Sequence, residues 1–216
     1  METKQKGIFI LISGIIGLLT TINFVWVSWI FGILAIVFGY KNRENVFAKS
    51  GLILGILTIV ILIFIKIILP IATGVATPLV IFESCSMHHS QKGFSEIFEK
   101  SDVYSENSIS LSDANNWNFQ NGLNKGDLIF ITPVKNPKIG DVILFKTSRG
   151  FSILHRVVST NPIMTKGDNN NAQLPDEKSI EQSQVVGKVS LKIPFVGWSK
   201  LIFSDYKRIP QERGFC

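Results

Sequence analysis

The chain has 216 residues, of which 46% are hydrophobic and 18% charged, and its formal net charge is +6. Because +4 of that charge lies in residues 1–82, beside long apolar runs, the positive balance fits membrane topology and argues against a nucleic-acid-binding protein. The two cysteines, Cys85 and Cys216, exclude a disulfide-rich scaffold and leave open a single bridge outside the cytoplasm.

The first apolar run, residues 7–40, contains no charged side chain and predicts a membrane anchor. A single helix of that length would measure about 51 Å, whereas a hydrocarbon core is about 30 Å thick. A polar interruption that includes Asn23 favours two short spans, near 7–21 and 25–40, with one tilted span as the alternative.

The second apolar run, residues 50–69, predicts an ordinary transmembrane helix that Pro70 ends. The basic residues of the loop before it, 41–49, predict that this loop is cytoplasmic. Residues 1–70 are therefore expected to form an anchor with two or three transmembrane helices. The chain is expected to be a multi-pass protein of the cell membrane, with residues 71–216 on the extracytoplasmic face.

Residues 71–216 change to short β-prone runs bounded by Gly, Pro, Asn or Ser, as strands are. These runs are 79–82, 127–132, 141–146, 151–158 and 185–192. Residues 91–124, rich in Ser, Asn, acidic and aromatic residues, interrupt them and predict an inserted lid or flap, or equally a solvated insertion without function. The chain has no nucleotide-binding glycine loop or zinc-type spacing, so no cofactor and no metal are expected.

A candidate nucleophile, Ser86, follows soon after the hydrophobic region, in the run Ser-Cys-Ser-Met. A serine hydroxyl needs a base within hydrogen-bond reach and donors for the developing oxyanion. The chain has three histidines. His88 lies too close in sequence to turn back onto the serine, whereas His155 lies on a predicted strand and can approach it from a neighbouring element.

Residues 77–90, T-P-L-V-I-F-E-S-C-S-M-H-H-S, resemble the nucleophile box of the signal peptidase I family. Further family motifs follow in order: G-D-L-I-F at 126–130, G-D-V-I-L-F-K at 140–146, H-R-V-V at 155–158, T-K-G-D-N-N at 165–170, then V-V-G-K-V and an I-P-F-V-G-W run ending at Trp198. Most bacterial members carry lysine where this chain has His155, so the chain resembles the archaeal and endoplasmic-reticulum branch, which uses serine and histidine.

The resemblance implies that Ser86 attacks the scissile carbonyl and that His155 is its general base. It also implies an oxyanion hole made by the Ser84 hydroxyl and the backbone N–H of Ser86. For the acid that orients the histidine, Asp176 ranks slightly ahead of Asp168, and either could instead be structural. Three departures from the family pattern are His89 in place of proline, Cys85 in place of glycine, and the long segment 91–124.

The fold implied is a mostly β signal-peptidase-like catalytic domain, anchored by N-terminal transmembrane helices, whose groove binds an extended peptide by strand addition. Walls of shallow substrate pockets are expected from Leu79, Val80, Ile81, Phe82, Met87 and Ile143.

The function implied is removal of signal peptides from exported precursor proteins. The expected partners are those precursors, the lipid bilayer and the protein-export machinery, with no nucleic acid. Two alternatives remain open: a dedicated maturation peptidase for a narrow set of surface proteins, and a catalytically inactive relative that serves as a scaffold.

Overall fold

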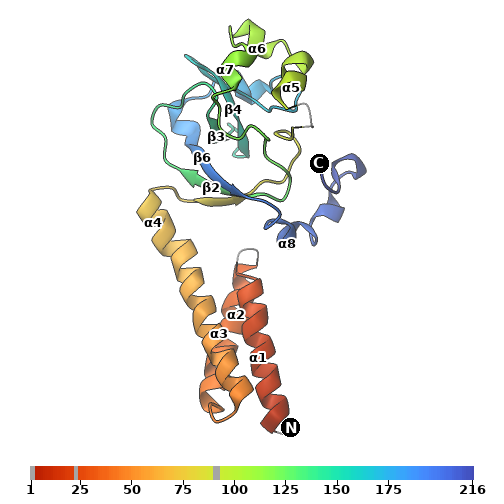
Figure 1. Cartoon of the computed structure of the whole chain (residues 1–216). Coiled ribbons are helices and arrows are strands. Elements are labelled where there is room, and N and C mark those ends of the chain that lie inside the picture. Colours follow the sequence, from red (N-terminus) through yellow and green to blue (C-terminus); the bar gives the residue numbers. More distant parts are fainter. Residues whose placement is uncertain (1–2, 22–23, 90–92) are drawn as a thin grey trace. The chain divides into compact units, whose positions relative to one another are not determined.

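The computed structural model describes residues 3–21, 24–89 and 93–216, in two compact units, Met1–Ala72 and Thr73–Cys216 (Figure 1). The division lies two residues beyond the boundary expected from the sequence, between 70 and 71. Asn23, on which the expected break between two spans depends, lies outside the described residues, as do residues 91 and 92 of the expected insertion.

The first unit consists of apolar helices: α1 (Thr3–Leu19), α2 (Val25–Lys41) and α3 (Val46–Ile63), the last continued by a π-helical segment (Phe64–Ile68) and α4 (Leu69–Thr73). Among the described residues one helix, Val46–Thr73, is long and apolar enough to cross a membrane by length and composition, and α2 is a shorter apolar helix. Anchoring by several helices therefore stays a prediction.

Small residues allow the three long helices to pack closely. A Cβ added to Gly51 of α3 would lie 2.5 Å from the carbonyl oxygen of Ile10 in α1. One added to Gly55 would lie 2.8 Å from the carbonyl oxygen of Gly32 in α2. Any larger side chain at either glycine would push α3 away from its neighbours, as expected for small-residue packing between apolar helices.

The second unit is built on a six-stranded antiparallel sheet in the order β1-β2-β6-β3-β4-β5. The strands are β1 (Leu79–Ile81), β2 (Leu128–Thr132), β3 (Val142–Lys146), β4 (Ser152–Thr160), β5 (Ile163–Lys166) and β6 (Val185–Ile193). All five runs predicted from the sequence are strands, so the mostly β nature of this unit is confirmed. Strand β5 was not predicted.

The described part of the insertion, residues 93–124, contains three short helices: α5 (Phe94–Lys100), α6 (Val103–Glu106) and α7 (Leu111–Ala114). Their apolar side chains form one cluster with Val158 of β4 and Met164 of β5. Tyr104 is fully buried there and stacks on Phe98 with 4.3 Å between ring centroids. These helices form a layer packed on the sheet, and a role of the segment as a lid or flap stays a prediction.

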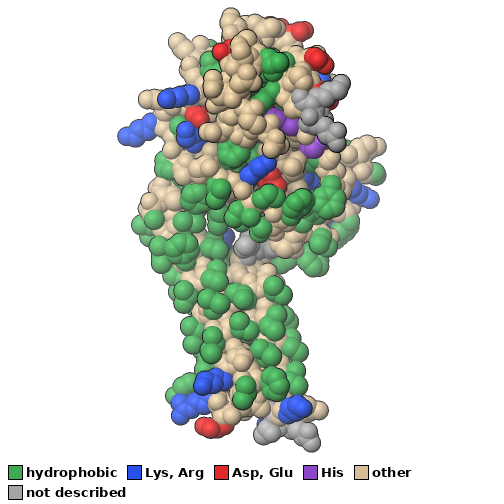
Figure 2. All heavy atoms as spheres, in the orientation of Figure 1, with side chains coloured by type: hydrophobic (Ala, Val, Ile, Leu, Met, Phe, Trp, Pro, Cys, Tyr) green, Lys and Arg blue, Asp and Glu red, His purple; other side chains and the backbone are tan. Residues whose placement is uncertain are grey.

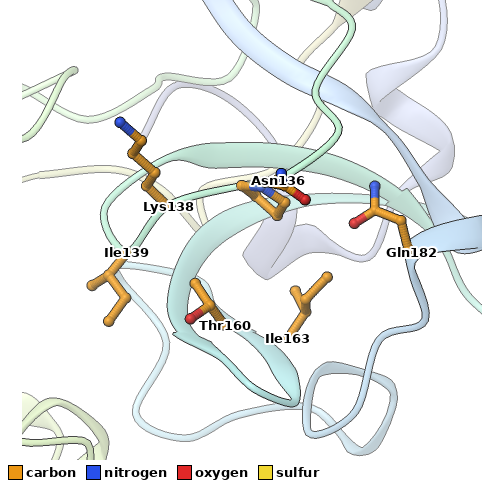
Figure 3. A pocket seen from close by; sticks show the side chains of 7 residues that line it. Asn136, Lys138, Ile139, Thr160, Ile163 and Gln182 are labelled. Carbon is orange, nitrogen blue, oxygen red and sulfur yellow. The ribbon is translucent and has the colours of Figure 1, made fainter.

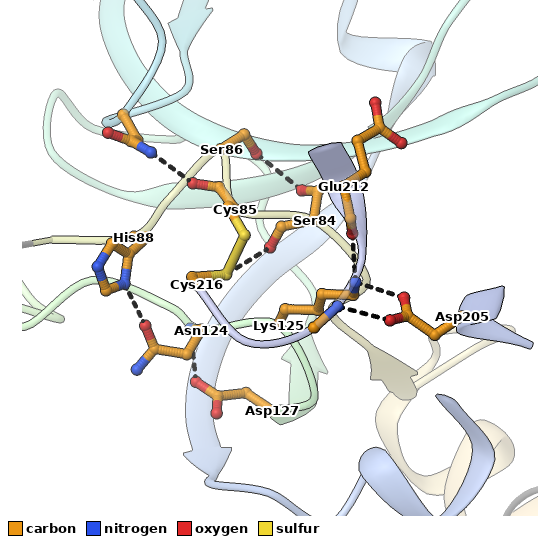
Figure 4. Close-up of a disulfide and its surroundings, with 12 residues drawn as sticks. Ser84, Cys85, Ser86, His88, Asn124, Lys125, Asp127, Asp205, Glu212 and Cys216 are labelled. Atoms are coloured by element: carbon orange, nitrogen blue, oxygen red, sulfur yellow. Dashed lines mark hydrogen bonds and ion pairs between the residues drawn. A yellow bond between two sulfur atoms is a disulfide. The ribbon is translucent and has the colours of Figure 1, made fainter. Parts of the chain in front are cut away.

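The chain after β6 forms α8 (Trp198–Leu201) and two 3₁₀ turns (Asp205–Lys207 and Pro210–Glu212) and returns to the turn that carries Ser86. Cys216 forms a disulfide with Cys85, across 5.5 Å between Cα atoms (Figure 4). The cysteine pairing that the sequence left open is therefore present.

Candidate active site

A tight turn after β1 presents Ser86. Phe82, directly after β1, still pairs with the segment before β2, because its N–H donates to the carbonyl of Asp127 at 2.9 Å. Five residues later Met87 is fully buried in the main core, and its carbonyl accepts from the N–H of Leu123 at 2.9 Å. The turn between these two fixed points holds Ser86 half-buried.

The hydroxyl of Ser86 lies 2.8 Å from Nε2 of His155. His155 stands on β4 and is 4% exposed, so the sheet fixes where its imidazole lies. The two residues are 69 positions apart in sequence, and the structure brings together the pair expected from the motifs. A serine hydroxyl hydrogen-bonded to an imidazole is the arrangement that general-base activation requires.

Glu177 completes the line of contacts. Its Oε1 lies 2.5 Å from Nδ1 of His155, and the same oxygen accepts from the hydroxyl of Thr165 at 3.0 Å. Its other oxygen accepts from the N–H of Leu174 at 2.7 Å, and the side chain is fully buried. A carboxylate at Nδ1 requires the ring to carry its proton there, which leaves Nε2 free to accept from Ser86.

The expectation that Asp176 orients His155 is corrected by this geometry. Asp176 accepts from the Ser148 hydroxyl at 3.3 Å and pairs with Arg149 at 3.4 Å. Asp176 and Glu177 both lie on the 3₁₀ turn Pro175–Glu177, but their side chains contact different partners. Glu177 directly follows Asp176, so the signal in the sequence was the next acidic residue.

Asp168, the other expected acid, does not contact His155 either. It is fully buried and accepts from the guanidinium of Arg156, with the shortest distance 2.7 Å from Nη2. His89 and Tyr104 bind the same carboxylate at 2.8 and 3.2 Å. Burial by itself would raise the pKa of Asp168, but the charge of Arg156 and the hydrogen bonds of His89 and Arg156 lower it below its usual range. We call these four residues the Asp168 network.

The turn that contains Asp168 touches both members of the pair. The N–H of Asn169 donates to the carbonyl of Ser86 at 2.8 Å, and its side-chain amide donates to the carbonyl of Cys85 at 3.1 Å. A Cβ added to Gly167 would lie 2.8 Å from Nε2 of His155. The K-G-D-N-N motif therefore positions the serine turn and leaves room for the imidazole.

Lys166, in the same motif, is fully buried behind the site. Its ammonium donates to the carbonyls of Gly167 and Asp168 at 3.0 and 3.2 Å and lies 5.0 Å from the centre of the Tyr104 ring. Burial lowers the pKa of Lys166 to about 8, against the opposing effect of the nearby carboxylates.

Ser84, expected in the oxyanion hole, lies on the same turn as Ser86, and the two hydroxyl oxygens are 3.0 Å apart (Figure 4). Because the Ser86 hydroxyl faces an acceptor nitrogen of His155, the Ser84 hydroxyl is the donor between the two serines. A donor therefore already points at the atom that is expected to react.

The residues expected to wall substrate pockets divide into two groups. Leu79, Val80 and Ile81 of β1 are partly exposed. Met87, Phe82 and Ile143 are buried in hydrophobic clusters of the sheet unit, so their expected place on a substrate-facing surface is corrected. Their apolar character reflects core packing.

One hydrogen-bonding edge of β1 has no partner strand in the described sheet. Pro78 accepts from the N–H of Ile131 and Phe82 donates to Asp127, so these residues turn their backbone groups toward β2. Because such groups alternate along an antiparallel strand, those of Leu79 and Ile81 face away from β2. Strand β1 is the first in the sheet order, and this outer side is an edge that another strand can pair with.

A hollow of about 590 Å³ lies elsewhere on the sheet unit, at the turn between β4 and β5 (Figure 3). It is lined by Asn136, Pro137, Lys138, Ile139, Thr160, Ile163 and Gln182. None of these residues belongs to the candidate site described above.

The chain is similar to catalytic subunits of signal peptidase complexes. It is 30% identical to the signal peptidase complex catalytic subunit SEC11C of Homo sapiens over an alignment of 99 residues that covers 39% of this chain and 52% of the relative. It is 28% identical to SEC11 of Colletotrichum graminicola and 29% identical to SEC11 of Pyricularia oryzae, in alignments of 97 residues that each cover 38% of this chain and 56% of the relative.

The chain thus spans about half the length of the curated relatives that it matches. No protein-family model matches it, and no solved structure matches it. The relatives confirm the resemblance to the reticulum-type branch of signal peptidases that the motifs indicated.

Proposed function

We propose that the protein is a membrane-bound serine endopeptidase that removes signal peptides from exported precursor proteins. The observation that carries this proposal is the line of contacts from the Ser86 hydroxyl to Nε2 of His155 at 2.8 Å and from Nδ1 to Glu177 at 2.5 Å. The names of the relatives, catalytic subunits of signal peptidase complexes, support the substrate class.

In the reaction the Ser86 oxygen attacks the scissile carbonyl while Nε2 of His155 takes the hydroxyl proton. The Glu177 carboxylate stabilises the imidazolium that forms, through the N–H at Nδ1. When the tetrahedral intermediate collapses, Nε2–H protonates the leaving amine and an ester remains on Ser86. Water then attacks the ester with His155 again as the base, which releases the acid and regenerates the serine.

The developing oxyanion needs donors close to Ser86. The Ser84 hydroxyl, 3.0 Å from the Ser86 oxygen, is one candidate, and the backbone N–H of Ser86 is the second. The bonds that Asn169 makes to the carbonyls of Cys85 and Ser86 support this assignment, because they hold the peptide groups of the turn in a defined orientation.

The precursor is proposed to bind as an added strand along β1. The outward backbone groups of Leu79 and Ile81 would pair with the extended peptide and lead it to Ser86, which follows the strand after a short turn. Signal peptides carry small residues at their cleavage point, so a shallow surface is sufficient there.

The helix unit is proposed to span the membrane more than once. Apolar side chains cover its visible face, with Lys and Arg at one end (Figure 2). The start of α1 lies beside the loop between α2 and α3, because Gly7 packs against Asn45. Basic residues gather at this end: Lys4, Lys6, Lys41, Arg43 and Lys49. By the positive-inside rule, this basic end is expected to be cytoplasmic. The sheet unit follows the other end of the long helix in the chain and is therefore proposed to be extracytoplasmic.

Cleavage of a precursor by the detergent-solubilised full chain tests the proposal. We expect the wild type to release a mature product, and Ser86→Ala and His155→Ala each to lower kcat by about 10³-fold or more. Ser183→Ala, a change of an exposed serine near the start of β6, is the matched control and should retain activity. If the wild type never cleaves, or if Ser86→Ala cleaves as well as the wild type, the proposal fails.

A panel of precursors then measures breadth. Cleavage of many unrelated signal peptides is expected from a general signal peptidase, and cleavage of one narrow class would instead identify a dedicated maturation peptidase.

A further inference from the structure

His89, which stands where the family motif has proline, is held at both ring nitrogens. It is 8% exposed and follows Ser86 by three positions. Its Nε2 lies 2.8 Å from Oδ2 of Asp168, and its Nδ1 lies 2.8 Å from the carbonyl oxygen of Gln120. Each ring nitrogen therefore faces an oxygen at hydrogen-bond distance.

Both of these oxygens are acceptors. A backbone carbonyl has no proton to donate, and the charge of Arg156 beside Asp168 helps to keep that carboxyl ionised. A neutral imidazole has one N–H and would satisfy only one of the two oxygens. Two bonds at 2.8 Å require two N–H donors, which only the imidazolium form of His89 supplies.

The surroundings of His89 suit a cation. The edge-on ring of Phe94, from α5, lies 4.7 Å away between centroids. Among the residues that the structure describes, the charged and titratable groups around it are those of the Asp168 network together with Lys166: Asp168 from the turn after β5, Arg156 from β4, Tyr104 from α6 and Lys166 from β5. The Asp168 carboxylate is the direct counter-charge of His89, and Tyr104 adds a neutral donor to its other oxygen.

The network joins the two halves of the candidate site. His89 belongs to the segment that carries Ser86, and Arg156 directly follows His155 on β4. Both bind one carboxylate, that of Asp168. We infer that His89 is a positioning residue, held as an imidazolium, which fixes the Ser86 segment against the His155 strand through Asp168. This inference rests on the proposed peptidase function.

A His89 ring with a single N–H would have a defined consequence. One of its two bonds, to Asp168 or to Gln120, must break, and the Ser86 segment is then less firmly held. A displacement of the order of 1 Å between reacting groups can lower the rate about 100-fold. We therefore expect kcat to be lower whenever His89 lacks one of these two bonds, with little change in KM.

The protonation state is measured directly by side-chain ¹⁵N NMR of the full chain labelled at its three histidines, assigned with His88→Gln and His155→Gln. We expect protons on both nitrogens of His89 at neutral pH, with coupling of each N–H to its acceptor. One protonated and one bare nitrogen at neutral pH would overturn the inference, whatever the activity of the protein.

The functional arm compares pH profiles of kcat for the wild type, His89→Gln and His88→Gln. A glutamine at 89 keeps a donor for Asp168 but carries no charge, so we expect kcat about 10- to 100-fold lower at neutral pH, with little change in KM. His88→Gln is the matched control: His88 bonds to Asn124 at 2.7 Å, outside the network, and this variant should keep the wild-type profile. Lys166 is present in all three proteins, so its titration by itself does not account for a difference between them.

Failure of the proposed peptidase function and failure of the positioning role of His89 give different results. A wild type that never cleaves a precursor rejects the proposed function, while the NMR result still tests the charge of His89. An active wild type whose kcat profile is unchanged in His89→Gln rejects the positioning role.

Discussion

Glu177 and Asp176 are adjacent acids with different surroundings, and substitution separates their roles. Glu177→Gln keeps the shape of the side chain but removes the charge that faces Nδ1 of His155. We expect kcat to fall about 10³- to 10⁴-fold, because an amide there favours the wrong tautomer and cannot stabilise the imidazolium. Asp176→Asn, which alters a contact with Arg149, should stay within a few-fold of wild type. Equal losses in both variants would contradict the assignment.

Lys166 makes the stability of the sheet unit depend on pH in a known direction. Its pKa is about 8 in the folded chain and returns to its ordinary value of 10.5 on unfolding, so the unfolded chain binds more protons between these values. The free energy of unfolding should therefore rise from pH 8 toward pH 10.5, as the cost of burying the ammonium disappears. Denaturant unfolding of the wild type and Lys166→Met measures this, and the variant should lack the rise. The same slope in both proteins would contradict it.

The residues of the site were predictable to different degrees. Ser86 and His155 lie in local motifs whose types and order survive in this chain, so their roles could be inferred before any geometry. Glu177 was missed because its function depends on a turn whose length differs from the family pattern, and its contact with His155 spans 22 residues. His89 was noted as a departure, but its partner Asp168 is 79 residues away.

Among the elements, the Cys85–Cys216 disulfide links the serine turn to the segment after α8 across 131 residues of sequence. Closing so long a loop in the unfolded chain is expected to stabilise the fold by about 2–5 kcal/mol. Cys85→Ser and Cys216→Ser should therefore lower the free energy of unfolding by equal amounts, and the double variant should lose no more than either one. Reduction of the wild type is the control and should give the same loss; a single variant as stable as the oxidised wild type would count against this role.

Elements with a clear pattern of apolar residues in the sequence were predicted more successfully than elements whose formation depends on tertiary packing. The five predicted strands have alternating or continuously apolar runs with turn residues at their ends. The short β5 and the four-residue helices α6 and α7 carry too little local pattern to be recognised. Their positions depend on tertiary contacts, such as burial of Tyr104 beneath the aromatic cluster and against Asp168.

At the scale of the whole molecule, the distribution of basic residues gives a testable topology. An epitope inserted in the loop 42–45 should react with antibody only after the membrane is permeabilised. One inserted in the exposed turn 148–150 should react on intact cells or outward-facing vesicles, because the sheet unit is expected on the extracytoplasmic face. Both insertions keep the full chain and its basic residues. Accessibility of both epitopes from the same side would exclude an anchor of this orientation.

The most direct measurement of the central claim is covalent labelling of the full chain with a serine-directed peptidyl phosphonate, followed by intact mass and peptide mapping. A serine activated by His155 should react stoichiometrically, with the label on Ser86, and Ser86→Ala and His155→Ala should remain unlabelled. Label on another residue, or equal labelling of Ser86→Ala, would contradict the account.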